Sequence, residues 1–112
     1  MGLSHDSREI GRTANGVAHR SLSRKILLQL LALQPNLSLS VLASHLGVRE
    51  SALYEYERGL RLMPLDLQER LSGFVVAHEP ALHRIAHRLR QQVEAARRYE
   101  AGEVVRHMTS PP

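Results

Sequence analysis

Apolar residues recur every three or four positions along most of the chain between residues 21 and 99, which predicts a series of amphipathic helices. The expected helices cover residues 21–34, 39–46, 50–58 and 64–78, with a last one from Pro80. That last helix ends near Tyr99 or passes Gly102 toward Met108. Because no stretch shows the alternation of a strand, the sequence predicts an all-α bundle of about five helices with an extended C-terminal helix.

Residues that start and stop helices divide this pattern. Either Ser21 or Ser23 can cap the first helix, and Ser38 is a good cap for the second. Gly47 and Gly59 follow the second and third helices, where a left-handed residue is expected. A proline opens each of the two later helices.

The segment 38–59 also meets the local requirements of a helix-turn-helix, in which two helices meet steeply through a tight turn. Ala43 supplies a small residue at the helix contact, and Gly47 follows it in the turn. The apolar residues that would lock the pair in place are Leu42, Leu46, Val48, Leu53 and Tyr56.

The run LSLSVLASHLGV followed by RESALYEYERGLR, residues 37–61, resembles the phage-repressor-like (XRE/Cro-type) helix-turn-helix family of bacterial transcription regulators. The resemblance implies a lambda-repressor-like fold whose third helix enters the major groove of duplex DNA, usually as a homodimer, with no enzymatic activity and no cofactor. The residues that agree in type and register are Ala43, Gly47, Leu53, Tyr56, Glu57, Arg58 and Gly59.

Under this resemblance the candidate DNA contacts fall into two groups. The base-facing positions are Arg49, Glu50, Ser51, Tyr54 and Glu55. The phosphate contacts come from the start of the second helix and the end of the third, at Ser38, Ser40, Arg58 and Arg61.

The sequence departs from the family pattern at several of these positions. Leu39 stands where a glutamine often braces a phosphate, and Arg49 stands where a serine or threonine often caps the third helix. The lost cap costs about 1 kcal/mol, which a contact from Arg49 to phosphate or guanine would offset. Glu50 and Glu55 either accept a hydrogen bond from cytosine or, as ordinary helix residues, have no part in DNA binding; Glu50 also suits a positive helix N-terminus.

Four segments are expected: a flexible basic arm at 1–20, the helix-turn-helix domain at 21–78, a C-terminal helix at 79–108, and a frayed tail at 109–112. Beyond the core contacts of its first turns, the C-terminal helix is expected to pair two copies of the chain, although its apolar seam could also pack on the chain's own core. The residues predicted for dimerisation are Leu89, Val93, Ala96 and Tyr99.

Charge is distributed unevenly. Through Lys25 there are five basic residues against two acidic ones, and from Arg84 to Arg106 six against three, whereas 37–77 is nearly neutral. Phosphate affinity would then come largely from the flanks, although a basic arm can also be a solubilising tail. The chain has no cysteine and no apolar run long enough to span a bilayer, so a cytoplasmic, nucleoid-associated protein is expected.

His83 and His87 have a spacing that two metal ligands can use, but solvated histidines on a helix surface are the expected reading, and no metal is predicted. No catalytic motif is present, so no enzyme is expected. Two functions remain open: a homodimeric DNA-binding regulator, or a helical interaction module (antitoxin-like, for example) that keeps the fold and binds another protein.

Overall fold

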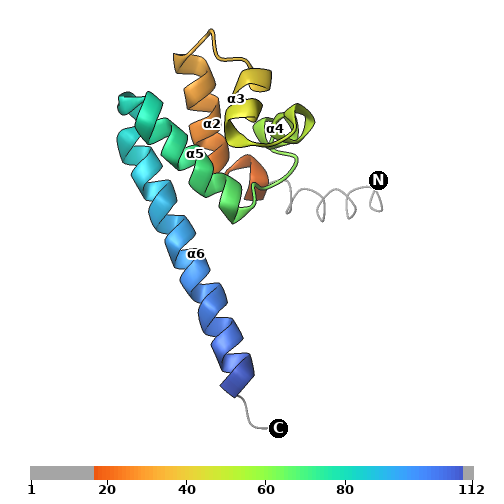
Figure 1. Ribbon diagram of the computed structural model, residues 1–112, viewed down its shortest axis with the longest axis vertical. Coiled ribbons are helices and arrows are strands. Elements are labelled where there is room, and N and C mark those ends of the chain that lie inside the picture. The colour runs from red at the N-terminus through yellow and green to blue at the C-terminus, as the bar shows by residue number, and fades with distance from the viewer. Residues whose placement is uncertain (1–16, 110–112) are drawn as a thin grey trace, which may run out of the picture.

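The computed structural model describes the backbone of residues 17–109 and the side chains of residues 17–102. This part of the chain is helical and contains no strand, as the sequence predicts (Figure 1). Its elements in chain order are α2 (Leu22–Leu33), α3 (Leu39–Leu46), α4 (Glu50–Glu57), α5 (Leu65–His78), the 3₁₀ helix η1 (Pro80–Leu82) and α6 (His83–Thr109).

Capping residues set the start of the first two of these helices. Of the two candidates for α2, Ser21 is the cap: its side chain accepts a hydrogen bond from the Arg24 backbone N–H, while Ser23 is buried. Ser38 caps α3 in the same way by accepting from the Val41 N–H at 3.2 Å. Each cap satisfies one of the backbone donors that a helix start leaves without a partner.

A glycine in the left-handed conformation ends both α3 and α4. Gly47 has φ 71° and Gly59 has φ 74°. The N–H of Val48 bonds to the carbonyl of Ala43 at 3.0 Å, and the N–H of Leu60 bonds to that of Glu55 at 2.9 Å. These bonds are typical of the Schellman motif, which closes a helix and turns the chain sharply away.

One hydrophobic core holds α2, α3, α4, α5 and the first half of α6 together. Leu27 of α2, Leu46 of α3, Leu53 of α4 and Leu71 of α5 are all buried in it. Ala43, predicted to lie at a close helix contact, is 2% exposed. The core is almost entirely aliphatic, as the scarcity of aromatic residues suggests.

The last helix differs from its prediction at its start, and at its end it follows the longer of the two predicted alternatives. Pro80 opens a 3₁₀ turn rather than the α-helix itself, and α6 then continues past Gly102 to Thr109. Figure 1 shows α6 packed along α5 at its start and extending beyond the bundle. In the described part of the chain, no helix is long and apolar enough to cross a membrane.

Leu89 and Val93, predicted to take part in a dimer contact, lie instead in the chain's own core, the alternative that the sequence left open. Leu89 is 0% exposed and Val93 is 2% exposed, both within the chain's own core. The bundle covers more of α6 than the apolar pattern of the sequence indicated, because α5 runs beside α6 for several turns. Of the other two residues, Ala96 is half-buried and Tyr99 is 71% exposed.

The predicted boundary of the N-terminal arm also changes. Residues 17–19 are helical and Ala18 is buried, so the folded part begins before residue 21. Residues 1–16 of the predicted arm and residues 110–112 of the predicted tail lie outside the described residues.

Candidate nucleic-acid interface

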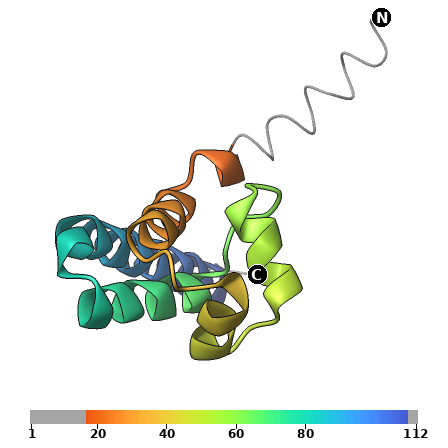
Figure 2. The same ribbon diagram turned by 90° about the horizontal axis from the view of Figure 1, so that it is seen from above.

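The outer face of α4 carries the residues predicted to face bases. Leu53 and Tyr56 are buried beneath it, while Arg49, Glu50 and Ser51 are exposed and Tyr54 is 46% exposed. Figure 2 shows α4 at the rim of the bundle, away from α5 and α6. The predicted base-facing side chains thus gather at an outer edge of the molecule, with Glu55 less exposed than the others.

Arg49 precedes α4 in an extended conformation and makes no capping bond. This is what its place in the sequence predicts, since a guanidinium cannot accept a hydrogen bond from the helix N–H groups. Its side chain is exposed. Arg49 therefore brings a positive charge to the start of α4 without stabilising the helix there.

Glu55 and Arg61 form an ion pair that the sequence did not predict. The Arg61 Nη1 lies 2.9 Å from Glu55 Oε2. The hydrogen bond that Arg61 donates to Glu55, then the negative charge of Glu55, and then Tyr56 raise the pKa of Arg61 above its ordinary value. The pair brings together one residue predicted to read bases and one predicted to bind phosphate, and each partly neutralises the other. The pair is exposed, so salt weakens it and it adds little to stability.

Arg58 is also held by a residue of the same face. Its Nη1 donates a 2.6 Å hydrogen bond to the Tyr54 hydroxyl, and its guanidinium carbon lies 5.3 Å from the centroid of the Tyr54 ring. The four-residue spacing places the two side chains one above the other on the helix. Tyr54 thus positions Arg58 at the end of α4.

The start of α3 supplies the remaining predicted contacts. Ser38 and Ser40 are exposed. The Ser38 oxygen accepts the capping bond, which leaves its hydroxyl hydrogen available to donate outward. Leu39 is half-buried against the core, so the position where the family often has a glutamine serves packing here.

Two further arginines, which the sequence did not single out for this role, support the α3–α4 unit from behind. Arg70 of α5 donates to the carbonyl of Leu46 at 2.6 Å, at the end of α3. Arg24 of α2 donates to the carbonyls of Glu57 at 2.9 Å and His19 at 2.9 Å. Arg24 was counted in the sequence among the basic residues through Lys25 that would bind phosphate, but both arginines satisfy helix ends within the chain. No sequence pattern marks such long-range contacts.

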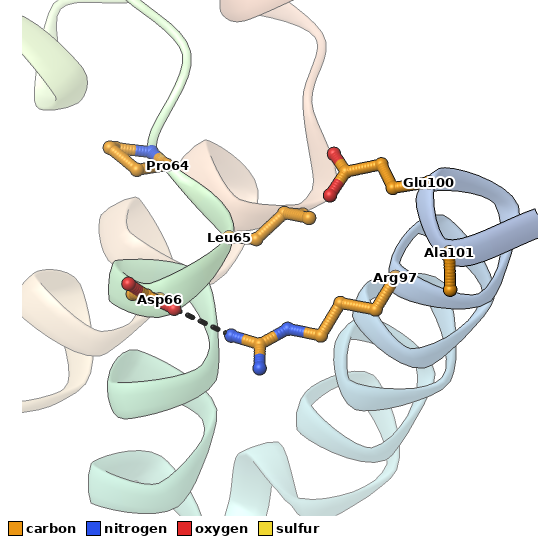
Figure 3. A pocket seen from close by; sticks show the side chains of 6 residues that line it. All are labelled: Pro64, Leu65, Asp66, Arg97, Glu100 and Ala101. Carbon is orange, nitrogen blue, oxygen red and sulfur yellow. Dashed lines mark hydrogen bonds and ion pairs between the residues drawn. The ribbon is translucent and has the colours of Figure 1, made fainter. Parts of the chain in front are cut away.

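A second exposed feature is a shallow groove between the start of α5 and the distal part of α6 (Figure 3). In it, Arg97 bonds to Asp66 at 2.7 Å and to Glu69 at 2.8 Å. Both partners of Arg97 are acidic, so the groove offers little to an anionic ligand. His83 and His87 are exposed, and no group of three or more potential metal ligands occurs among the residues that the structure describes.

Comparison of the chain with protein-family models, with curated proteins and with solved structures gave no match.

Proposed function

We propose that the chain is a DNA-binding transcription regulator in which α3 and α4 form a helix-turn-helix of the phage-repressor-like type. The observation that carries this proposal is the division of α4 into two faces. Leu53 and Tyr56 fix the helix to the core, while Arg49, Glu50 and Ser51 stand exposed at its N-terminal end. A recognition helix needs this arrangement, because its first turns must reach base edges in the major groove.

Phosphate contacts would come from both sides of this face. At the start of α3, Ser38 and Ser40 present hydroxyl groups beside free backbone donors, a setting that favours anions. At the end of α4, Arg58 and Arg61 each lie beside a residue of the base-facing group. On binding to DNA, Arg61 would either move from Glu55 to a phosphate or stay in the ion pair, where its positive charge screens the Glu55 carboxylate from the DNA.

Titration of a labelled random-sequence duplex with the full chain at increasing salt tests the proposal. It predicts binding whose affinity falls steeply as salt rises, because phosphate contacts release counterions. Arg49→Ala is expected to weaken this binding without abolishing it, while the protein keeps its helicity, measured by circular dichroism. Absent or salt-insensitive duplex binding at low ionic strength would contradict the proposal.

The homodimer stays part of the proposal, with a changed contact. Since Leu89 and Val93 are used in the chain's own core, only the distal part of α6 remains, where Tyr99 is exposed. Sedimentation equilibrium of the chain and of Tyr99→Ala tests this contact. A monomer at all concentrations for both proteins would remove the dimer from the proposal.

The second candidate function is a protein-interaction module. Exposed apolar residues beside α4 favour it: Leu60 is 52% exposed, Leu62 is 48% exposed, and Tyr54 adds an aromatic ring. The carboxylates of Glu50 and Glu55 on the same face are unfavourable for a polyanion and acceptable for a protein. A protein-interaction module would not bind duplex DNA. The original chain, Glu50→Gln and Glu55→Gln would then all show no nucleic-acid binding.

A further inference from the structure

One side of α6 is basic along four helical turns. The residues on it lie within an arc of about 100° opposite Leu89 and Val93, as 3.6 residues per turn requires. Glu94 lies at the edge of this arc, and Glu100 lies beside the groove on the α5 side (Figure 3). The members of this basic face are Arg84, His87, Arg88, Gln91, Ala95 and Arg98, all exposed.

The arginines of the basic face are not used by the fold. Arg84, Arg88 and Arg98 have no hydrogen bond or ion pair within the part of the chain that the structure describes. Arg97, one position away from Arg98, is by contrast held by two carboxylates of α5. The charges of the basic face thus raise the self-repulsion of the molecule without stabilising it, which suggests that a partner uses them.

The dimensions and chemistry of the face suit a nucleic-acid backbone. Arg84 and Arg98 are 14 residues apart by their numbers, so they lie about 21 Å apart along a straight helix. One DNA strand presents about six phosphates over that length. Within its arc the face has guanidinium groups, which bind phosphate with two parallel hydrogen bonds, and no large apolar side chain. Exposed Tyr99 lies just outside the arc, at the edge opposite Glu94.

The basic face is separate from the proposed recognition helix. α6 packs on α5 and α2, whereas α4 packs on α3 and α2. Figure 1 shows α6 on one side of the bundle and α3 and α4 on the other. A duplex seated on α4 therefore approaches a different side of the molecule from the basic face.

We infer that the basic face of α6 binds the phosphate backbone of duplex DNA independently of base sequence, as a second DNA-contact surface. The variant Arg84→Gln/Arg88→Gln/Arg98→Gln tests it. With a random-sequence duplex, the slope of log affinity against log salt is expected to fall by about 2–3 in magnitude, because each lost phosphate contact removes about 0.9. An unchanged slope in a variant with unchanged helicity would overturn the inference.

A matched pair on the same helix controls for net charge. Arg88→Gln and Arg90→Gln remove the same charge from exposed positions two residues apart, but only Arg88 lies on the basic face. Arg88→Gln is expected to lower the salt slope by about 1, and Arg90→Gln is expected to change it much less. Equal effects would mean that the duplex responds to overall charge and not to this face.

The absence of native cysteine allows a direct map of the contact. A photo-crosslinker attached at Gln91→Cys, in the middle of the basic face, is expected to label duplex DNA, while one at Ala77→Cys on α5 is not. Unlabelled poly-glutamate and unlabelled duplex, added at equal charge, are then compared as competitors of the crosslink. Stronger competition by poly-glutamate would assign the face to an acidic protein and contradict the inference. If Arg49→Ala did not affect binding, the proposed recognition helix would be contradicted but the basic face would not, because the face is tested by substitutions at Arg84, Arg88 and Arg98.

Discussion

At the scale of single residues, the arginines divide into those that the fold uses and those that it leaves to solvent. Arg24, Arg70 and Arg97 each have partners on another element. Arg58 and Arg61 have partners within the α4 region, at its outer face. The sequence gives the net charge of the chain, but only the three-dimensional contacts show which arginines remain available.

Glu55→Gln is expected to raise the affinity for random-sequence duplex. The change removes a negative charge from the proposed DNA-facing side and frees Arg61 from its 2.9 Å ion pair. One additional phosphate contact would increase the magnitude of the salt slope by about 0.9, measured by fluorescence anisotropy across several salt concentrations. Arg61→Gln is the matched control and should have the opposite effect. Weaker binding by Glu55→Gln would indicate that this carboxylate contacts a base.

Arg24→Ala is expected to lower the free energy of unfolding by about 1–2 kcal/mol, because two charge-assisted bonds to backbone carbonyls are lost. Lys25→Ala, at the exposed neighbouring position, should stay within about 0.5 kcal/mol of the original protein. Urea unfolding measures both. Equal stability of the two variants would show that the Arg24 contacts contribute nothing measurable.

At the scale of elements, local signals predicted most helix limits. Ser21, Ser38, Gly47 and Gly59 occupy the positions that their side chains or backbone freedom suit. The extent to which α6 packs on the bundle was not predictable, because burial of Val93 depends on how far α5 runs beside it. Periodicity shows that a helix has an apolar face, but it does not show which surface covers that face.

Gly59→Ala is expected to destabilise the protein more than Gly47→Ala. Both positions have positive φ, which costs a residue with a side chain about 1–2 kcal/mol. At Gly59 an added methyl group would also lie 2.9 Å from the Cα of His19, a backbone atom that cannot move aside easily. At Gly47 it would meet only the end of the Arg70 side chain, at 3.2 Å. Thermal unfolding of the two variants decides the order, and a less stable Gly47→Ala would contradict this account of the turns.

At the scale of the whole molecule, the fold separates two outward surfaces with different residues. The α4 face mixes arginines with carboxylates and a tyrosine, which suits selective contacts. The basic face of α6 has no carboxylate between its arginines in the described part, which suits contacts that do not depend on sequence. The sequence indicated basic flanks, but the structure was needed to show that Arg84, Arg88 and Arg98 lie exposed on the face of α6 opposite its buried residues Leu89 and Val93.

Leu89→Ala is expected to lower the unfolding free energy of the single chain by about 2–5 kcal/mol, because the side chain is fully buried within its own bundle. Tyr99→Ala, at a position 71% exposed, should leave that stability nearly unchanged. Urea unfolding at two protein concentrations separates the effects. A loss in Leu89→Ala that disappears at high concentration would restore Leu89 to a dimer contact.

The most direct test of the central claim is selection of sequences from a random duplex library with the purified full chain. The proposed recognition helix predicts enrichment of a defined motif, and it predicts that Arg49→Ala loses or alters that motif while still retaining salt-sensitive binding to random duplex. Two half-sites in the motif would support the homodimer. A library that stays random after repeated selection, with the folded chain and at low salt, would contradict the assignment of α4 as a helix that reads DNA.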